Sequence, residues 1–95
     1  MVKIIAEFFV KPESAGEAVN LAKELVAETK KESGCIAYNL FSDETNDAHI
    51  VIIEEWASQE ILDIHSASSH FVRLVPAIAA LCEKEPSVRT YTKIA

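Results

Sequence analysis

Two histidines and a tryptophan are the side chains best suited to chemistry in this sequence. His65 and His70 lie close together, and Trp56 precedes them at the end of an apolar run. Imidazole exchanges a proton near neutral pH more readily than any other side chain, so His65 and His70 are candidate acids, bases or hydrogen-bond donors. The alternative interpretation is structural, with each histidine only stabilising a break between two helices.

Four side chains are candidates for substrate contact: Trp56, Glu54, Asn39 and Phe71. The indole of Trp56 offers either an aromatic surface for stacking or a large anchor for the core. Glu54 shares a strand face with Trp56, and a carboxylate in apolar surroundings has a raised pKa and can act as a base. Glu54 can instead pair with a lysine or arginine. Asn39 lies on a predicted strand and needs hydrogen-bond partners if it is buried.

The sequence predicts no bound cofactor and no metal. Its two glycines are too few for a phosphate-binding or dinucleotide-binding loop, which needs close backbone approach at several glycines. The spacing of His65 and His70 matches no recognised metal signature. Cys35 and Cys82 lack the Cys-x-x-Cys spacing of a zinc site and are too few for a disulfide framework, so they are expected to pack as apolar residues.

Length and charge limit the classes of protein to which the chain can belong. Its 95 residues suit one domain, residues 1–95, and its content of 49% apolar and 25% charged residues is that of a globular chain. A net charge of −6 disfavours nucleic acid and anionic membrane surfaces as partners. No apolar run approaches the length of a membrane span, and a cytoplasmic location is expected.

A sheet and a set of helices must position the candidate residues. Alternating and β-branched residues predict strands at 2–10, 35–42, 49–56 and 88–94, and helical spacing predicts helices within 14–33, 59–66 and 68–83. Ser14 and Glu17 form a capping box at the first helix start, and Pro76 should kink or restart the last helix. The order βαββαβ predicts an α+β, ferredoxin-like fold with a four-stranded antiparallel sheet and helices on one face.

Both faces of this sheet are apolar, which predicts a dimer. One layer of helices covers only one face, and a monomer rarely exposes a large apolar patch. We therefore expect a two-fold homodimer in which the two sheets pack against each other. If the residues of the hairpin alternate strictly, one face carries Ile36, Tyr38, Leu40, Val51 and Ile53, and the other carries Ala37, Asn39, Phe41, Ile50, Ile52 and Trp56.

Several motifs extend over nearly the whole chain. They are Gly34-Cys35-x-x-Tyr38, Glu54-Glu55-Trp56-x-Ser58-x-Glu60-x-Leu62-x-x-His65-x-x-Ser68-x-His70-Phe71, Pro76-x-Ile78, Pro86 and Tyr91. Together they resemble the domain of the antibiotic biosynthesis monooxygenase family. This resemblance implies a dimeric α+β barrel, in which each subunit has a pocket between its sheet and its helices.

The resemblance also implies an activity. Family members that act on quinols or anthrones oxygenate an electron-rich aromatic with O2 alone, without flavin, haem or metal. Trp56, His65 and His70 match the pocket residues of such members. Ile52 and Leu62 stand where anthrone-oxidising members carry asparagine and tyrosine, so the quinol-oxidising branch is the better match.

Three functional hypotheses follow. The first is a homodimeric, cofactor-independent monooxygenase that acts on a small quinol, with His65 as the proton-transfer partner and His70 in support. The second is an isomerase of a hydroxyketone or a small signalling sugar, in which His65 and Glu54 move a proton next to a carbonyl and Arg73 is the main candidate to bind a phosphate. The third is a non-catalytic, ligand-binding dimer.

Overall fold

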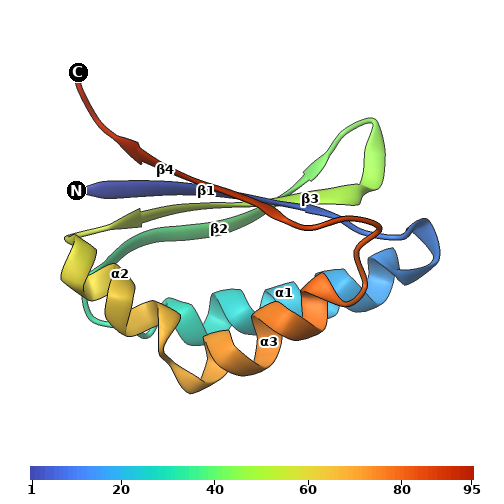
Figure 1. The fold of residues 1–95 in the computed structure, drawn as a ribbon, viewed down its shortest axis with the longest axis horizontal. Coiled ribbons are helices and arrows are strands. Elements are labelled where there is room, and N and C mark those ends of the chain that lie inside the picture. The colour runs from blue at the N-terminus through green and yellow to red at the C-terminus, as the bar shows by residue number, and fades with distance from the viewer.

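Four strands form one antiparallel sheet, and the helices cover one of its faces, in a computed structural model that describes residues 1–95 (Figure 1). The strand order in the sheet is β2-β3-β1-β4. The elements are β1 (Val2–Phe9), η1 (Pro12–Ser14), α1 (Ala15–Thr29), β2 (Cys35–Asp43), β3 (Asn46–Trp56), α2 (Gln59–Ser66), α3 (Ser69–Ala79) and β4 (Ser87–Thr92). The predicted ferredoxin-like order and layering are confirmed.

The start of α1 differs from the predicted capping box. Ser14 is the N-cap residue, but its side chain makes no hydrogen bond to the helix. The 3-10 turn η1 leads straight into α1, and the Ala15 N–H already bonds to the Pro12 carbonyl. The 3-10 turn therefore satisfies the Ala15 N–H through the backbone, and the hydrogen bond to the Ser14 hydroxyl that the capping box requires does not form.

Serine caps begin the two helices that carry the histidines. Ser58 and Ser68 each accept a backbone hydrogen bond at 3.3 Å from the residue three positions further on. His65 lies in the last turn of α2, and His70 lies in the first turn of α3. The Ser68 cap therefore lies between the two imidazoles and fixes the direction in which the chain turns from α2 into α3.

Helix α3 continues past Pro76 without a break and ends at Ala79, so it is shorter than predicted. Proline removes one helical N–H, but the Ala80 N–H bonds to the Pro76 carbonyl at 3.0 Å and closes the last turn. The chain then pairs with the end of β1 through a bridge between Val10 and Cys82. This pairing occupies the backbone groups that a longer helix would have used.

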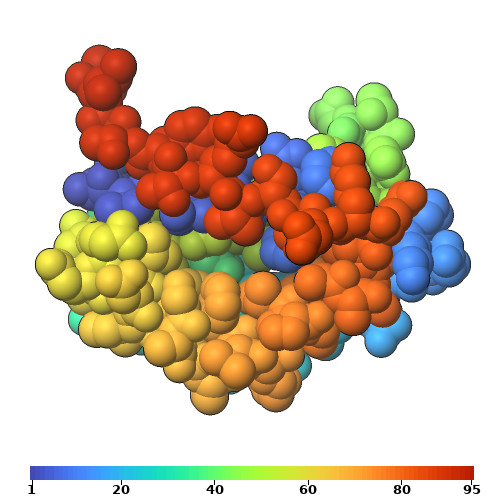
Figure 2. Space-filling view, in the orientation of Figure 1, coloured from blue at the N-terminus to red at the C-terminus, as the bar shows by residue number.

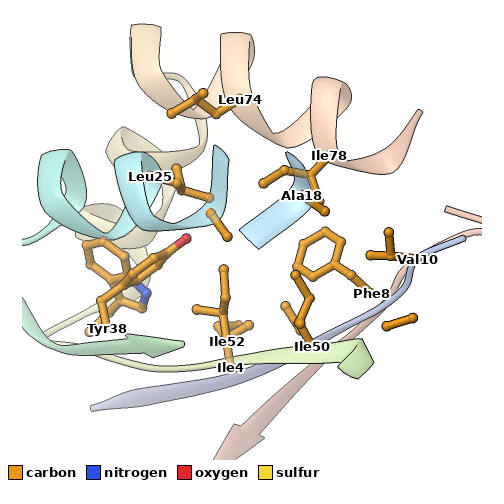
Figure 3. Close-up of a cluster of buried hydrophobic side chains, with 14 residues drawn as sticks. Ile4, Phe8, Val10, Ala18, Leu25, Tyr38, Ile50, Ile52, Leu74 and Ile78 are labelled. Atoms are coloured by element: carbon orange, nitrogen blue, oxygen red, sulfur yellow. The ribbon is translucent and has the colours of Figure 1, made fainter. Parts of the chain in front are cut away.

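The core lies between the sheet and the helices. Figure 3 shows Ile4, Phe8, Ile50 and Ile52 rising from the strands toward Leu25, Leu74 and Ile78 on the helices, and all of them are buried. Trp56 and Tyr38 are the largest fully buried side chains. Burial of apolar area on this scale is what holds the helices on the sheet.

Two irregularities in β2, one of them a β-bulge at Ile36, set its register against β3. Cys35 pairs with Trp56, whereas Ala37 pairs with Glu55, so Ile36 has no partner on β3. A second irregularity lies between Ser42 and Asp43. As a result Tyr38 pairs with Glu54, and Leu40 pairs with Ile52, on the helix side. The predicted grouping of Tyr38 with Ile53 is therefore wrong, because the register shift between Ser42 and Asp43 places Tyr38 opposite Glu54 instead of Val51.

The other face of the sheet carries no helix. Its apolar members include Ile5, Val51, Ile53 and Phe41, and we call this surface the open face. Phe41 is 50% exposed in the isolated chain. Lys3 and Glu55 form an ion pair at 3.6 Å on the same face.

Candidate active site

A cavity of about 200 Å³ lies between the sheet and helices α2 and α3. Hydrophobic side chains form most of its wall, among them Ile52 from the sheet and Leu62, Phe71 and Val75 from the helices. Val88 and Thr90 of β4 complete the rim and are themselves exposed, so the cavity reaches solvent beside this edge strand. Figure 2 shows the corresponding hollow between the red C-terminal strand and the yellow and orange helices.

His65 is an almost fully buried imidazole in the wall of this cavity. It is 1% exposed, and aromatic rings surround it. Its ring centroid lies 4.4 Å from that of Trp56, 5.1 Å from that of Phe71 and 5.5 Å from that of Tyr38. Burial lowers the pKa of His65, although the neighbouring Glu32 carboxylate opposes this effect, so the neutral imidazole is favoured.

Glu32 fixes which nitrogen of His65 carries the proton. The Glu32 Oε2 atom lies 2.6 Å from Nδ1 of His65. An ionised carboxylate only accepts hydrogen bonds, so Nδ1 of the neutral ring must carry the hydrogen and Nε2 must carry the lone pair. The Nε2 atom is buried and has no hydrogen-bond partner in the protein. It is therefore a free proton acceptor on a residue of the cavity wall.

His70 shares the same carboxylate oxygen from the other side. Its Nε2 atom lies 2.7 Å from Oε2 of Glu32 and 3.2 Å from Oγ of Ser68. The Ser68 hydroxyl donates to the His65 carbonyl at 2.6 Å, which leaves its oxygen free to accept from His70. His70 does not line the cavity. Its place in the structure is to hold Glu32 and the turn between α2 and α3.

Glu54 is the second titratable group of the cavity wall. It is only 6% exposed, and its Oε1 atom accepts a hydrogen bond from Nε1 of Trp56 at 2.9 Å. Burial raises the pKa of Glu54 to about 7, and the Trp56 hydrogen bond only partly offsets this rise. Near neutral pH the cavity thus contains a carboxyl group that can either donate or accept a proton.

The structure brings some of the predicted site residues together and separates others. His65, Glu54 and Phe71 line the cavity. Trp56 lies behind them, is fully buried and contacts Glu54 and His65 instead of the cavity. Asn39 pairs with Ile53 on the open face and is exposed, so the structure places it away from the cavity.

Glu32 was missed by the sequence reasoning. It lies in the loop after α1, and 33 positions separate it from His65. No local spacing marks such a contact, because only the packing of the α1–β2 loop against the α2–α3 turn creates it. Its position shortly before Gly34, whose φ is 85°, is the one hint that this loop turns sharply.

The cavity wall contains no permanently charged basic side chain. None of its lining residues is a lysine or an arginine. Arg73, which the sequence suggested as a phosphate ligand, has a side chain that is 61% exposed and forms an ion pair with Glu24. The wall therefore offers no lysine or arginine side chain to bind a phosphate.

Comparison with known proteins agrees with this geometry. The profile of a family described as antibiotic biosynthesis monooxygenase matches residues 1–77. The chain belongs to the antibiotic biosynthesis monooxygenase family. A crystal structure described as an antibiotic biosynthesis monooxygenase is 42% identical, covers 100% of both chains and has a TM-score of 0.96. A conserved protein from Methanosarcina mazei Go1 is 35% identical over 98% of this chain and 92% of its own, with a TM-score of 0.94.

Two curated relatives are similar to this family member in sequence. YcnE of Bacillus subtilis, which has a provisional monooxygenase name, is 30% identical over 71 residues, or 75% of each chain. The uncharacterised protein sll1783 of Synechocystis is 31% identical over 82 residues, or 86% of this chain. The match spans only 56% of sll1783, little more than half its length. The resemblance expected from the sequence motifs is confirmed at the level of the family.

None of the helices combines the length and the apolar character needed to cross a bilayer.

Proposed function

We propose that this family member is a cofactor-independent monooxygenase that oxidises a small quinol with O2. The observation that best supports this proposal is the buried, unpartnered Nε2 of His65 on a residue lining a mostly apolar cavity. The other ring nitrogen of His65, Nδ1, is held by a hydrogen bond to the Glu32 carboxylate. This arrangement resembles the carboxylate–histidine pairs that enzymes use to orient a general base.

Proton removal is the first step. The Nε2 lone pair of His65 takes the proton of a quinol hydroxyl, and the Glu32 carboxylate stabilises the imidazolium that forms. The apolar walls leave the resulting quinolate with few hydrogen-bond partners. A poorly solvated anion of this kind is a stronger electron donor than the same anion in water.

Electron transfer to O2 follows. The quinolate gives one electron to O2, and the superoxide and semiquinone combine at a ring carbon to form a peroxide, which takes the proton held by His65. Loss of the proton on that carbon then breaks the O–O bond and releases water. The sum is quinol plus O2 giving hydroxyquinone plus one water. Glu54 lines the same cavity, and in its protonated form it would donate a hydrogen bond to the developing peroxide.

The size of the cavity suits a small aromatic. A dry cavity of about 150 Å³ takes up benzene, so the cavity of about 200 Å³ seen here suits one substituted ring or a compact pair of rings. The absence of lysine and arginine from its wall disfavours a phosphorylated substrate. For the isomerase alternative, the presence of two proton-exchanging groups, His65 and Glu54, in one cavity favours an uncharged hydroxyketone over a phosphorylated sugar.

The proposal includes a cytoplasmic homodimer. Ile5, Val51, Ile53 and Phe41 lie on the open face, and no element of the same chain covers them. Packing this face against that of a second copy would remove the apolar patch from water. The cavity lies on the other side of the sheet, so each subunit would keep its own site.

Oxygen uptake tests this proposal. The purified protein is mixed with methylhydroquinone or menadiol, and O2 consumption is compared with spontaneous oxidation at the same pH. We expect faster uptake with a hydroxyquinone product, loss of the excess rate in His65→Ala, and retention of it in His49→Ala. Uptake equal to the spontaneous rate would overturn the oxygenase proposal. Turnover of a hydroxyketone under anaerobic conditions would favour the isomerase instead, and binding without turnover would favour the ligand-binding dimer.

A further inference from the structure

We propose that Glu32, His65 and His70 form a binding site for a divalent transition-metal ion, best matched by Zn²⁺, and that the bound ion prevents His65 from accepting a proton. The metal site rests on side-chain geometry alone. The inhibitory effect rests in addition on the function proposed above, in which Nε2 of His65 is the base. The two parts can therefore be tested separately.

The donor atoms already converge on a small volume. Oε2 of Glu32 lies 2.6 Å from Nδ1 of His65 and 2.7 Å from Nε2 of His70, and all three atoms lie within 4.8 Å of one another. Zinc binds nitrogen and oxygen ligands at roughly 2.0–2.2 Å, which places tetrahedral ligands about 3.4 Å apart. A small outward movement of the three side chains would therefore make room for the ion.

The chemistry of the donor set matches zinc. Two imidazoles and one carboxylate, with a fourth position left for water, form a common zinc coordination set. The sequence spacing of His65 and His70 gave no such signal, because the third ligand, Glu32, comes from a distant loop. Only the fold brings the set together.

Solvent can reach the cluster from one side. The side chains of Glu32 and His70 are 15% and 16% exposed, while that of His65 is 1% exposed. An ion would thus arrive at Glu32 and His70 and bind the inward-lying His65 last. The net charge of −6 raises the concentration of cations near the surface and favours this approach.

Binding of the ion would exchange the donor and acceptor roles of the two ring nitrogens of His65. Nδ1 now carries the hydrogen that it donates to Glu32, and coordination requires the Nδ1 lone pair. A neutral imidazole has one N–H, so that hydrogen must move to Nε2, with no net gain or loss of protons. Nε2 then becomes a donor and cannot take a proton from a substrate. The ion would act as an inhibitor that leaves the cavity itself unchanged.

Direct titration tests the site without any substrate. Zn²⁺ binding is measured by calorimetry, and Co²⁺ binding by its visible absorption spectrum, for the wild type, Glu32→Gln and His70→Gln. We expect one ion per chain in the wild type. In Glu32→Gln and His70→Gln the affinity should fall by at least the roughly 10–100-fold that loss of a side chain hydrogen-bonded to a ligand costs in zinc sites. The matched control is His49→Gln, because His49 also lies near two carboxylates, Asp43 and Glu7, each at 3.1 Å.

The outcomes separate clearly. The site is overturned if no ion binds, if affinity is unchanged in Glu32→Gln and His70→Gln, or if His49→Gln alone abolishes binding. Nitrogen NMR of His65 in the wild type needs no variant that must fold, and the hydrogen should move from Nδ1 to Nε2 when Zn²⁺ is added. If the tautomer changes while quinol oxidation continues at the same rate, the inhibitory effect and the role of His65 as base are both wrong, whereas the metal site stands.

Discussion

The Glu32 carboxylate lies 2.6 Å from Nδ1 of His65, so a surface loop and a helix end that are 33 positions apart in sequence share one hydrogen bond at the cavity wall. This bond fixes the tautomer of a buried imidazole and leaves its other nitrogen unpartnered. It also makes Glu32 a positioning residue, one that acts through His65 and does not line the cavity.

Replacement of Glu32 by glutamine should lower turnover more than substrate binding. The amide keeps the size of the side chain but removes the charge that stabilises the His65 imidazolium. We expect kcat for quinol oxidation to fall by roughly 10²–10⁴-fold, the usual contribution of a positioned base, with KM changed little. Steady-state O2 uptake measures both constants. Glu28→Gln, an exposed carboxylate paired with Lys31, is the control. A rise in KM with kcat unchanged would show that Glu32 has no role in orienting the base.

The buried Glu54 should make stability depend on pH in the direction opposite to most carboxylates. Its pKa rises from 4.5 to about 7 on folding, so the folded protein keeps a proton that the unfolded chain loses. The contribution of Glu54 to the free energy of unfolding is therefore fully present below about pH 4.5, and it is lost as the pH rises to about 7. The total loss is about 3 kcal/mol of unfolding free energy.

Urea unfolding at pH 5 and pH 8 checks this expectation at fixed protein concentration. The wild type should lose most of that free energy between the two pH values, and Glu54→Gln should lose much less. Glu55→Gln, which changes the neighbouring carboxylate on the open face, should behave like the wild type. Parallel losses in wild type and Glu54→Gln would contradict the raised pKa.

Gly34→Ala should destabilise the fold, and Gly16→Ala should not. Gly34 has a φ of 85°, and an added Cβ would lie 2.7 Å from Cγ2 of Ile61. We expect a loss of about 1–3 kcal/mol from the left-handed backbone and this contact. A Cβ at Gly16, in α1, meets no atom within 4 Å, so alanine there should add up to about 1 kcal/mol of helix stability. Urea unfolding of both variants measures the two changes in stability. Equal changes in the free energy of unfolding would contradict the roles given to Gly34 and Gly16.

Ile53→Arg should convert the proposed dimer into monomers. The substitution places a charge in the middle of the open face, where burial against a second copy would leave it unpaired. Light scattering should show the mass of one chain for this variant. Val72→Arg, at a helix position that is 59% exposed, should keep the mass of the wild type. A wild-type protein that is already monomeric, or an Ile53→Arg protein of unchanged mass, would exclude this interface.

Periodicity and turn chemistry were enough to predict the fold class, the helix-facing residues of β3 and the place of His65 and His70 at a helix break. Those features depend on local patterns, such as the serine caps and the apolar stripe on α1. The sequence did not point to Glu32, and it grouped Asn39 with Trp56 on one face of the hairpin. Glu32 reaches the site through a contact between distant loops. Asn39 lies on the open face because the register of β2 against β3 shifts between Ser42 and Asp43, and no local pattern predicts that shift.

The bulge in β2 has a consequence for changes in chain length. Ile36 is the unpaired extra residue, and it is 55% exposed, so its deletion would leave a regular ladder in which Cys35 still meets Trp56 and Tyr38 still meets Glu54. Insertion of one residue at the same place would instead add a second unpaired residue to the bulge or shift Cys35 away from Trp56. This strand should therefore tolerate shortening by one position far better than lengthening by one.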